Sequence, residues 1–285
     1  MLFQSSCRRK SRHQTDRRPR RRLARGMENL EERRLLSADG WVQPTGLIAT
    51  SYVQVDNSGF AYLAGTTPDS AEGDRDVAIK KYSPDGTSLE WETRLIANGT
   101  DRVFDLVLDE AQNEFYVFGT FEGASPHDSS ITSQGGIDMF VMKFSALDGS
   151  VIWQKTWGST GTEEILGASI YSGAAYVVGT FDSDLLDIDG QQLEGQSGEL
   201  RGFILKLNSQ GEVVWVEQPT GPAITRGISV AAGPSAGTAN VFIDGYYGSG
   251  ASGSTSQIYF GDIPLSSEGR SQFVAAIQDS GSEAV

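Results

Sequence analysis

Tryptophans recur at one fixed interval in this chain, because Trp91, Trp153 and Trp215 each lie 62 residues from the next. A similar segment precedes each of them: residues 76–86 read DVAIKKYSPDG, residues 138–149 read DMFVMKFSALDG and residues 201–211 read RGFILKLNSQG. A weaker copy, SQFVAAI at residues 271–277, lacks the lysine. A period of this length predicts stacked supersecondary units rather than one irregular globule.

Each repeat is expected to contain four short strands, because β-branched and aromatic residues alternate with polar ones between Gly, Asn and Asp turns. The third strand is the segment quoted above, and the fourth carries the tryptophan. First strands are expected at residues 52–56, 103–109, 165–171 and 228–232. Second strands end in an aromatic-x-x-Gly signature at residues 62–65, 116–119, 176–179 and 242–245. No sustained 3.6-residue apolar period follows residue 40, so the sequence predicts an all-β fold.

Four-stranded units repeated around an axis build a β-propeller. The last repeat lacks an outer strand, and residues 40–44 look like an outer strand whose own blade is missing. We therefore predict a propeller over residues 40–278, closed by this N-terminal strand, with a flexible C-terminus at residues 279–285. Its four predicted blades lie near residues 47–95, 103–157, 165–217 and 226–277. Tryptophans are expected to fill the space between neighbouring blades, and these are Trp41, Trp91, Trp153 and Trp215.

The combined pattern resembles the bacterial SBBP-type β-propeller repeat. The shared elements are Val-x-Val-Asp, Gly-x-x-Tyr-Val-x-Gly-Thr, Asp-x-Phe-Val-x-Lys-Tyr and a following Gly and Trp, and the likeness spans residues 41–277. The chain departs from that family in blade number, since the family name refers to seven, and in the fourth repeat, which has lost the lysine. The resemblance implies a propeller scaffold.

Positive charge gathers at the N-terminus, where residues 1–39 carry 12 Lys and Arg against 5 acids. The rest of the chain carries 11 basic and 32 acidic residues, a balance that repels nucleic acid. After the arginines, residues 28–40 are similar to the Leu-Glu-Pro-Arg-x-Leu-Leu sorting segment of planctomycete surface and secreted proteins, with Glu32 where that segment usually has Pro. The matching residues are Leu30, Glu31, Arg33, Leu35, Leu36 and Ser37.

This resemblance implies that residues 1–39 are a disordered targeting leader and that the protein is extracellular or on the cell surface. Met27 is a second candidate start. The alternative is an Arg-rich arm that contacts nucleic acid. No apolar run reaches the roughly 18 residues of a transmembrane helix, and no apolar h-region follows the arginines to make an ordinary signal peptide. Cys7 is the only cysteine, so nothing in the body depends on a disulfide.

Catalytic and metal chemistry have few candidates. The chain has two histidines, His13 in the leader and His127 in a loop rich in Ser and Gly, and nothing beside His127 resembles a nucleophile elbow. One usable histidine and no cysteine in the body argue against zinc. Four aspartates close together are a weak candidate site for Ca²⁺, which takes oxygen ligands from flexible loops. They are Asp182, Asp184, Asp187 and Asp189.

The loops between second and third strands lengthen along the chain and carry 13 acids; they are residues 67–75, 121–137, 181–200 and 247–270. Equivalent loops of a propeller emerge on one face, so this loop face is predicted to bind a basic partner or Ca²⁺, or else to be merely solvated. We expect a non-enzymatic exported propeller without a cofactor, acting as an interaction or structural module for a protein or cell-envelope partner. The alternatives are a small propeller enzyme, a Ca²⁺- or glycan-binding module with its site on the loop face, and nucleic-acid contact through the leader.

Overall fold

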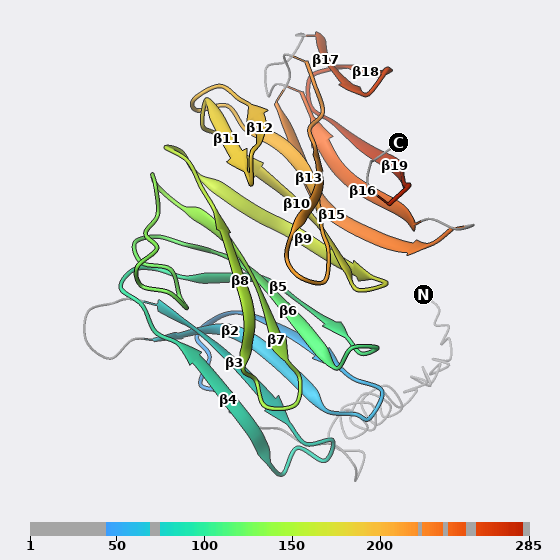
Figure 1. Ribbon diagram of the computed structural model, residues 1–285. Coiled ribbons are helices and arrows are strands. Elements are labelled where there is room, and N and C mark those ends of the chain that lie inside the picture. The colour runs from blue at the N-terminus through green and yellow to red at the C-terminus, as the bar shows by residue number, and fades with distance from the viewer. Residues whose placement is uncertain (1–43, 69–74, 222–223, 236–238, 249–254, 282–285) are drawn as a thin grey trace, which may run out of the picture. The chain divides into compact units, whose positions relative to one another are not determined.

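Strands account for all the regular structure that is described. The computed structural model describes residues 44–68, 75–221, 224–235, 239–248 and 255–281, which belong to one compact unit, Gln43–Val285. It contains 19 strands in antiparallel sheets, and no helix occurs in these residues (Figure 1). The all-β prediction is therefore confirmed. No helix of the described residues is long and apolar enough to cross a lipid bilayer.

Three of the predicted repeats form four-stranded antiparallel sheets in which each strand pairs with the next along the chain, except that in sheet 3 the second and third strands pair across an inserted hairpin. Sheet 1 contains β1 (Ala49–Val55), β2 (Ala61–Pro68), β3 (Arg75–Tyr82) and β4 (Leu89–Leu95). Sheet 2 contains β5 (Arg102–Asp109), β6 (Glu114–Phe121), β7 (Asp138–Ser145) and β8 (Val151–Trp157). Sheet 3 contains β9 (Glu163–Tyr171), β10 (Ala174–Phe181), β13 (Arg201–Leu207) and β14 (Val213–Glu217). This is the strand order of a propeller blade.

Sheet 4 has three strands among the described residues, namely β15 (Thr225–Pro234), β16 (Ala239–Tyr247) and β19 (Ser271–Asp279). The outer strand predicted for it, with Trp41, falls on residues 40–44, and the leader falls on residues 1–39. Apart from Pro44, all of these lie outside the described residues. Closure of a ring by the N-terminal strand therefore stays a prediction.

The two longest of the predicted loops contain β-hairpins, so their assignment as loops was wrong. The first hairpin pairs β11 (Leu185–Ile188) with β12 (Gln191–Glu194), and the second pairs β17 (Thr255–Phe260) with β18 (Ile263–Glu268). In the first, Asp189 and Gly190 take φ angles of 49° and 89°, which is the double positive φ of a type I′ turn. The alternation of Leu186 and Ile188 with aspartates puts both apolar side chains on one buried face.

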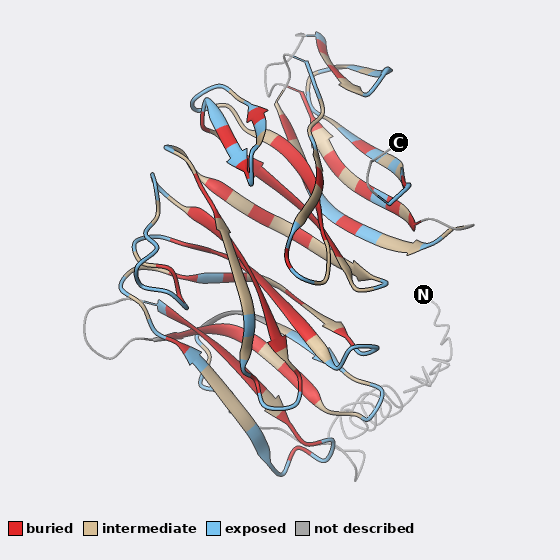
Figure 2. Ribbon diagram, in the orientation of Figure 1, coloured by how far each residue is buried: buried red, intermediate tan, exposed pale blue. Residues whose placement is uncertain are grey.

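Successive sheets pack face to face, with the first strand of each sheet beside the first strand of the next, in the order β1, β5, β9 and β15. Two hydrogen bonds join these strands: Ala168 N donates to Asp105 Oδ2 at 3.2 Å, and Ala232 N donates to Ser169 Oγ at 3.0 Å. Both faces of sheet 2 are covered, so β6 and β7 are buried almost throughout (Figure 2). Covered on both sides, these strands read as continuous apolar runs instead of alternating ones.

The hydrophobic core is divided into three parts, each lying between two consecutive sheets. Sheets 1 and 2 enclose one cluster, sheets 2 and 3 a second and sheets 3 and 4 a third. The hairpins take part, because Leu186, Ile188 and Leu193 belong to the second cluster and Ile258 belongs to the third. The loop face is thus partly a cover over the core.

Candidate functional site

A lysine in the third strand links each of the first three sheets to the one that follows. Its ammonium group donates a hydrogen bond of 2.9 Å to a main-chain oxygen of the next repeat. The three pairs are Lys81 with Ala146, Lys143 with Ser209 and Lys206 with Gly281. The same ammonium lies over the ring of the tyrosine opposite in the second strand, which is Tyr62, Tyr116 or Tyr176. A cation over an aromatic face is attracted by the ring quadrupole. We call this arrangement, repeated three times, the inter-sheet joint.

The tryptophan of the fourth strand rests against a glycine turn of the following sheet. A Cβ on Gly149 would lie 2.6 Å from Cε3 of Trp91, and one on Gly211 would lie 3.0 Å from Cδ2 of Trp153. Both glycines have positive φ, 72° and 80°. Trp153 also donates from Nε1 to Ser209 O at 3.1 Å. The turn needs glycine for its backbone conformation and again for the close approach of the indole.

The joint between sheets 3 and 4 has a carboxylate at its centre. Asp279 accepts hydrogen bonds from Lys206 Nζ at 2.6 Å, from Tyr176 Oη at 2.5 Å and from Trp215 Nε1 at 3.2 Å. Burial raises the pKa of the Asp279 carboxyl, but these donors more than offset burial and hold that pKa below its ordinary value. The sequence predicts a flexible C-terminus at residues 279–285. At Asp279 this is wrong, because that residue is the last of β19, whereas residues 282–285 lie outside the described residues.

Two buried carboxyl groups lie at the opposite end of the joint between sheets 2 and 3. Asp138 is 2% exposed and Glu163 is fully buried. Asp138 Oδ2 accepts from Gln134 N at 2.9 Å, whereas Oδ1 is buried without a hydrogen-bond partner among the described residues. Glu163 accepts from Ser183 Oγ and from Ser159 N, both at 2.8 Å.

Burial governs the protonation of both groups. It raises the pKa of Asp138 to about 6, and the single N–H from Gln134 offsets this only in part. Burial also raises the pKa of Glu163, with a smaller contribution from the negative charge of Asp138. Carboxyl groups of this kind are candidates for general acid or base chemistry. Here both groups are buried and accept hydrogen bonds from the main chain of the segments at 134–137 and 159–162. Their role in this structure is therefore to hold those two loops in place.

Sequence reasoning missed this carboxyl pair, although a signal was present. An aspartate opens the third-strand segment of the first two repeats, at Asp76 and Asp138, and both are buried. An acid also stands at the start of the next first strand, at Asp101 and Glu163, and both of these are buried too. Thr225 takes the corresponding position before sheet 4.

The four aspartates considered for Ca²⁺ serve separate local contacts. Asp182, Asp184 and Asp187 each accept a main-chain hydrogen bond, from Thr162, Ser197 and Gly190 respectively. Asp189 contacts sheet 2, accepting from Lys155 Nζ and from Trp157 Nε1, each at 2.8 Å. Over the described residues, no group of three or more acidic, histidine or cysteine side chains is placed to hold a metal ion. His127 is exposed. The Ca²⁺ site stays a prediction without structural support.

Open space lies at the turn end of the sheets, away from the loop face. Between sheets 2 and 3 a groove of about 500 Å³ is lined by Gln112, Glu114, Lys143, Trp153 and Gln210, among others. Gln112 and Gln210 are exposed. Lys143 and Glu114 form an ion pair at 2.5 Å on its wall. A groove of this size with amide, charged and indole groups has the dimensions of a ligand site.

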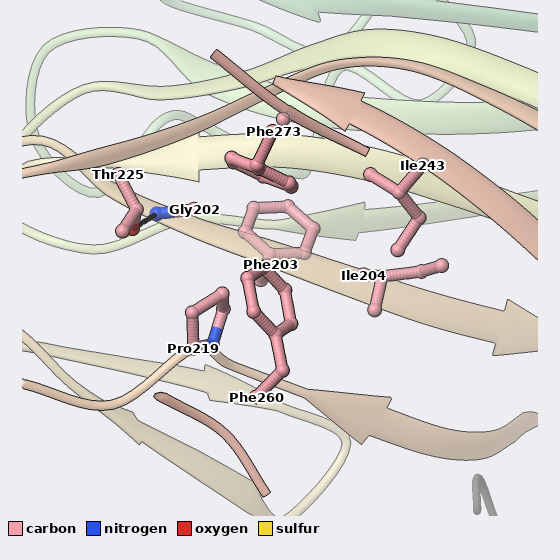
Figure 3. A pocket seen from close by; sticks show the side chains of 9 residues that line it. Gly202, Phe203, Ile204, Pro219, Thr225, Ile243, Phe260 and Phe273 are labelled. Atoms are coloured by element: carbon pink, nitrogen blue, oxygen red, sulfur yellow. Dashed lines mark hydrogen bonds between the residues drawn. The ribbon is translucent and has the colours of Figure 1, made fainter. Parts of the chain in front are cut away.

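A second cavity, between sheets 3 and 4, is too small for a ligand. It measures about 20 Å³ and is lined mostly by apolar side chains, including Phe203, Ile243, Phe260 and Phe273 (Figure 3). That volume is close to the minimum for one water molecule, and an apolar lining gives water no partners. Figure 3 shows the aromatic rings converging on this space, with Thr225 Oγ1 accepting from Gly202 N at its edge. It is a gap in packing.

Comparison with known proteins adds little. No family profile and no curated protein matches the chain. Among solved structures, a mutant of B. megaterium levansucrase has a TM-score of 0.35 and 11% identity, over 81% of this chain and 65% of that one. The tail fiber of a Staphylococcus aureus phage has a TM-score of 0.25 and 8% identity, over 85% of this chain and 52% of that one. The chain thus spans less than two thirds of the length of either structure, and similarity at this level carries no argument about fold or function.

Proposed function

We propose that this protein is a non-enzymatic, exported β-propeller of about four blades that serves as an interaction module for a protein or cell-envelope partner. The observation that carries the proposal is the inter-sheet joint. The lysine, tyrosine and tryptophan that define the sequence repeat are engaged in joining one sheet to the next, as at Lys143, Tyr116 and Trp153. The chemistry that recurs in the chain therefore builds a scaffold, and the exposed ends of the sheets are left for a partner.

The groove between sheets 2 and 3 is the surface we assign to that partner. Purified protein is expected to bind a cell-envelope fraction, and the double variant Gln112→Arg and Gln210→Arg is expected to lose this binding because two long charged side chains fill the groove. The matched control is Gln192→Arg, an exposed glutamine on β12 of the loop face. Loss of binding with the control alone would move the site to the loop face. No binding by the unmodified protein would refute the interaction role.

The closing strand is tested by two truncations. Removing residues 40–46 is expected to destabilise the body, because β19 would lose the outer strand that we propose for it. Removing residues 1–38 is expected to be almost neutral, because a polar Arg-rich segment buries little apolar surface. Equal thermal stability of the two truncated proteins would contradict closure by residues 40–44.

Export is tested with a reporter. Residues 1–39 fused to a fluorescent protein are expected to move it out of the cytoplasm of a planctomycete, and Leu35→Asp with Leu36→Asp is expected to abolish this movement. A reporter that stays cytoplasmic with the intact leader would favour nucleic-acid contact by the arginines instead.

A further inference from the structure

Each sheet has one face that meets the following sheet, and sheets 1 to 3 bury it. We call this the leading face. It carries the tyrosine of the second strand. It also carries an aliphatic residue of the third strand, two positions before the lysine that pairs with this tyrosine. Tyr62, Tyr116 and Tyr176 are at most 2% exposed, and the aliphatic residues Ile79, Val141 and Ile204 are at most 3% exposed.

Sheet 4 leaves the same register positions open. Phe242 pairs with Ala276 as Tyr116 pairs with Lys143, so Phe242 takes the tyrosine position. Phe242 is 49% exposed, and Val274, at the aliphatic position, is 75% exposed. An apolar face that is covered in three sheets and bare in the fourth is half of an interface.

The complementary half is exposed on sheet 1. The trailing face of a sheet is the one that meets the preceding sheet, and in sheet 2 it includes Leu106, which is fully buried. The residue of sheet 1 in this position is Val53, paired with Leu63 as Leu106 is paired with Val117. Val53 is 61% exposed and its neighbour Val55 is 57% exposed.

These exposed valines lie on the strand that such an interface uses. In the existing joints the second strand of one sheet packs on the first strand of the next, as β2 packs on β5, β6 on β9 and β10 on β15. The corresponding pair is β16 with β1. The leading face of sheet 4 and the trailing face of sheet 1 therefore match in register, and both are exposed in the same chain.

We propose that the leading face of sheet 4 binds the trailing face of sheet 1 on a second copy of this chain. The contact is heterologous, so repeated use either closes a ring of copies or extends a fibre. This inference rests on the proposed propeller-like succession of sheets, but it places the contact between sheet 4 and sheet 1 between two chains instead of within one.

The joint between copies is weaker than those within the chain. Ala276 stands where Lys81, Lys143 and Lys206 stand in the other sheets, so the lysine bond to the next sheet is missing. Asp244 also stands opposite Val274 and makes a hydrogen bond with Ser229 on the same sheet. Assembly is therefore concentration-dependent, and Ala276→Lys is expected to strengthen it.

Cross-linking decides where the partner face comes from. In full-length protein carrying Cys7→Ser, which removes the only native cysteine, one preparation carries Val53→Cys and another carries Phe242→Cys. A short bismaleimide added to the mixture is expected to link the two chains into a heterodimer. A third preparation carries both cysteines. If it links only within one chain and the mixture gives no heterodimer, the chain closes on itself; the assembly is refuted and the propeller stands. If neither links, the two faces do not meet, and both the assembly and the closed propeller are refuted.

Sedimentation gives an independent measure. The unmodified protein is expected to gain mass with rising concentration, and Val274→Asp is expected to weaken the association on the order of a hundredfold, because it places an unpaired charge in an apolar contact. Leu147→Asp is the control, since Leu147 is also 75% exposed but lies on a turn of sheet 2. Association that is unchanged by Val274→Asp, or equally weakened by both variants, refutes the proposal.

Discussion

The buried carboxyl of Asp138 makes the stability of this protein depend on pH in a direction that can be calculated. Its pKa is raised by burial from 3.8 to about 6. A carboxyl whose pKa is higher in the folded than in the unfolded protein binds protons preferentially when folded, at every pH between the two values. Stability therefore increases as the pH falls from above 6 to about 4, and is lost again as the pH rises through 6.

The size of the effect follows from the two pKa values. A difference of about two units, at 1.4 kcal/mol for each, gives a cost of up to about 3 kcal/mol at pH 8 for keeping the ionised group buried. Asp138→Asn removes the charge and can still accept from Gln134 N. The variant is expected to be more stable than the unmodified protein at pH 8, by about 1–3 kcal/mol, and nearly equal to it at pH 4. Part of the slope will remain, because the pKa of Glu163 is raised too.

Urea unfolding followed by tryptophan fluorescence, repeated between pH 4 and pH 8, measures this slope. The control is Asp148→Asn on an exposed turn of the same sheet, where hydrogen bonds from Ser150 lower the pKa of the carboxyl. That variant should keep the slope of the unmodified protein. If Asp138→Asn also keeps the full slope, the carboxyl is not buried as described, and the reasoning from burial fails.

Two further predictions concern the inter-sheet joint. Lys143→Met is expected to cost about 2–4 kcal/mol of unfolding free energy, because Lys143 is 4% exposed and its loss leaves buried acceptors unpaired. Lys155→Met, at an exposed ion pair, should cost less than about 1 kcal/mol. Similar costs for the two variants, measured by chemical denaturation, would contradict the role of Lys143 in the joint. Gly149→Ala should cost about 1–3 kcal/mol more unfolding free energy than Gly190→Ala. Both glycines have positive φ, but a Cβ on Gly149 would meet the indole of Trp91, whereas a Cβ on Gly190 would have nothing within 4 Å. Equal melting temperatures of the two variants would refute the contact with the indole.

The repeat was the part of the fold that the sequence predicted well. Period-two patterns place first and second strands close to where the structure has them, as at Val103–Asp109 against β5 (Arg102–Asp109). The spacing of the tryptophans located the fourth strands, since Trp91, Trp153 and Trp215 lie in β4, β8 and β14. These features are local to one repeat, so each can be read without knowing what it packs against.

Features that depend on two repeats at once were not predictable in the same way. The lysine of the third strand was seen as part of a motif, but its acceptor lies about 65 residues away in the next sheet. The sequence predicts acidic loops where the structure has the two hairpins. The strand character of the first hairpin rests on the alternation of Leu186 and Ile188 with aspartates and on the Asp189–Gly190 turn. The second hairpin, at residues 255–268, carries only two acids, Asp262 and Glu268. The raised pKa of Asp138 comes from burial by loops that sequence patterns do not position.

The inter-sheet joint also bears on how such a chain can change in length over evolution. Every contact of a joint comes from two consecutive repeats, and none requires a residue from a third. Duplicating the DNA of one repeat therefore supplies a sheet with both a leading face and a trailing face, and the joints between the older repeats keep their contacts. A gene built in this way can gain or lose whole units by unequal recombination without any compensating substitution, and only the two outermost surfaces have to adapt.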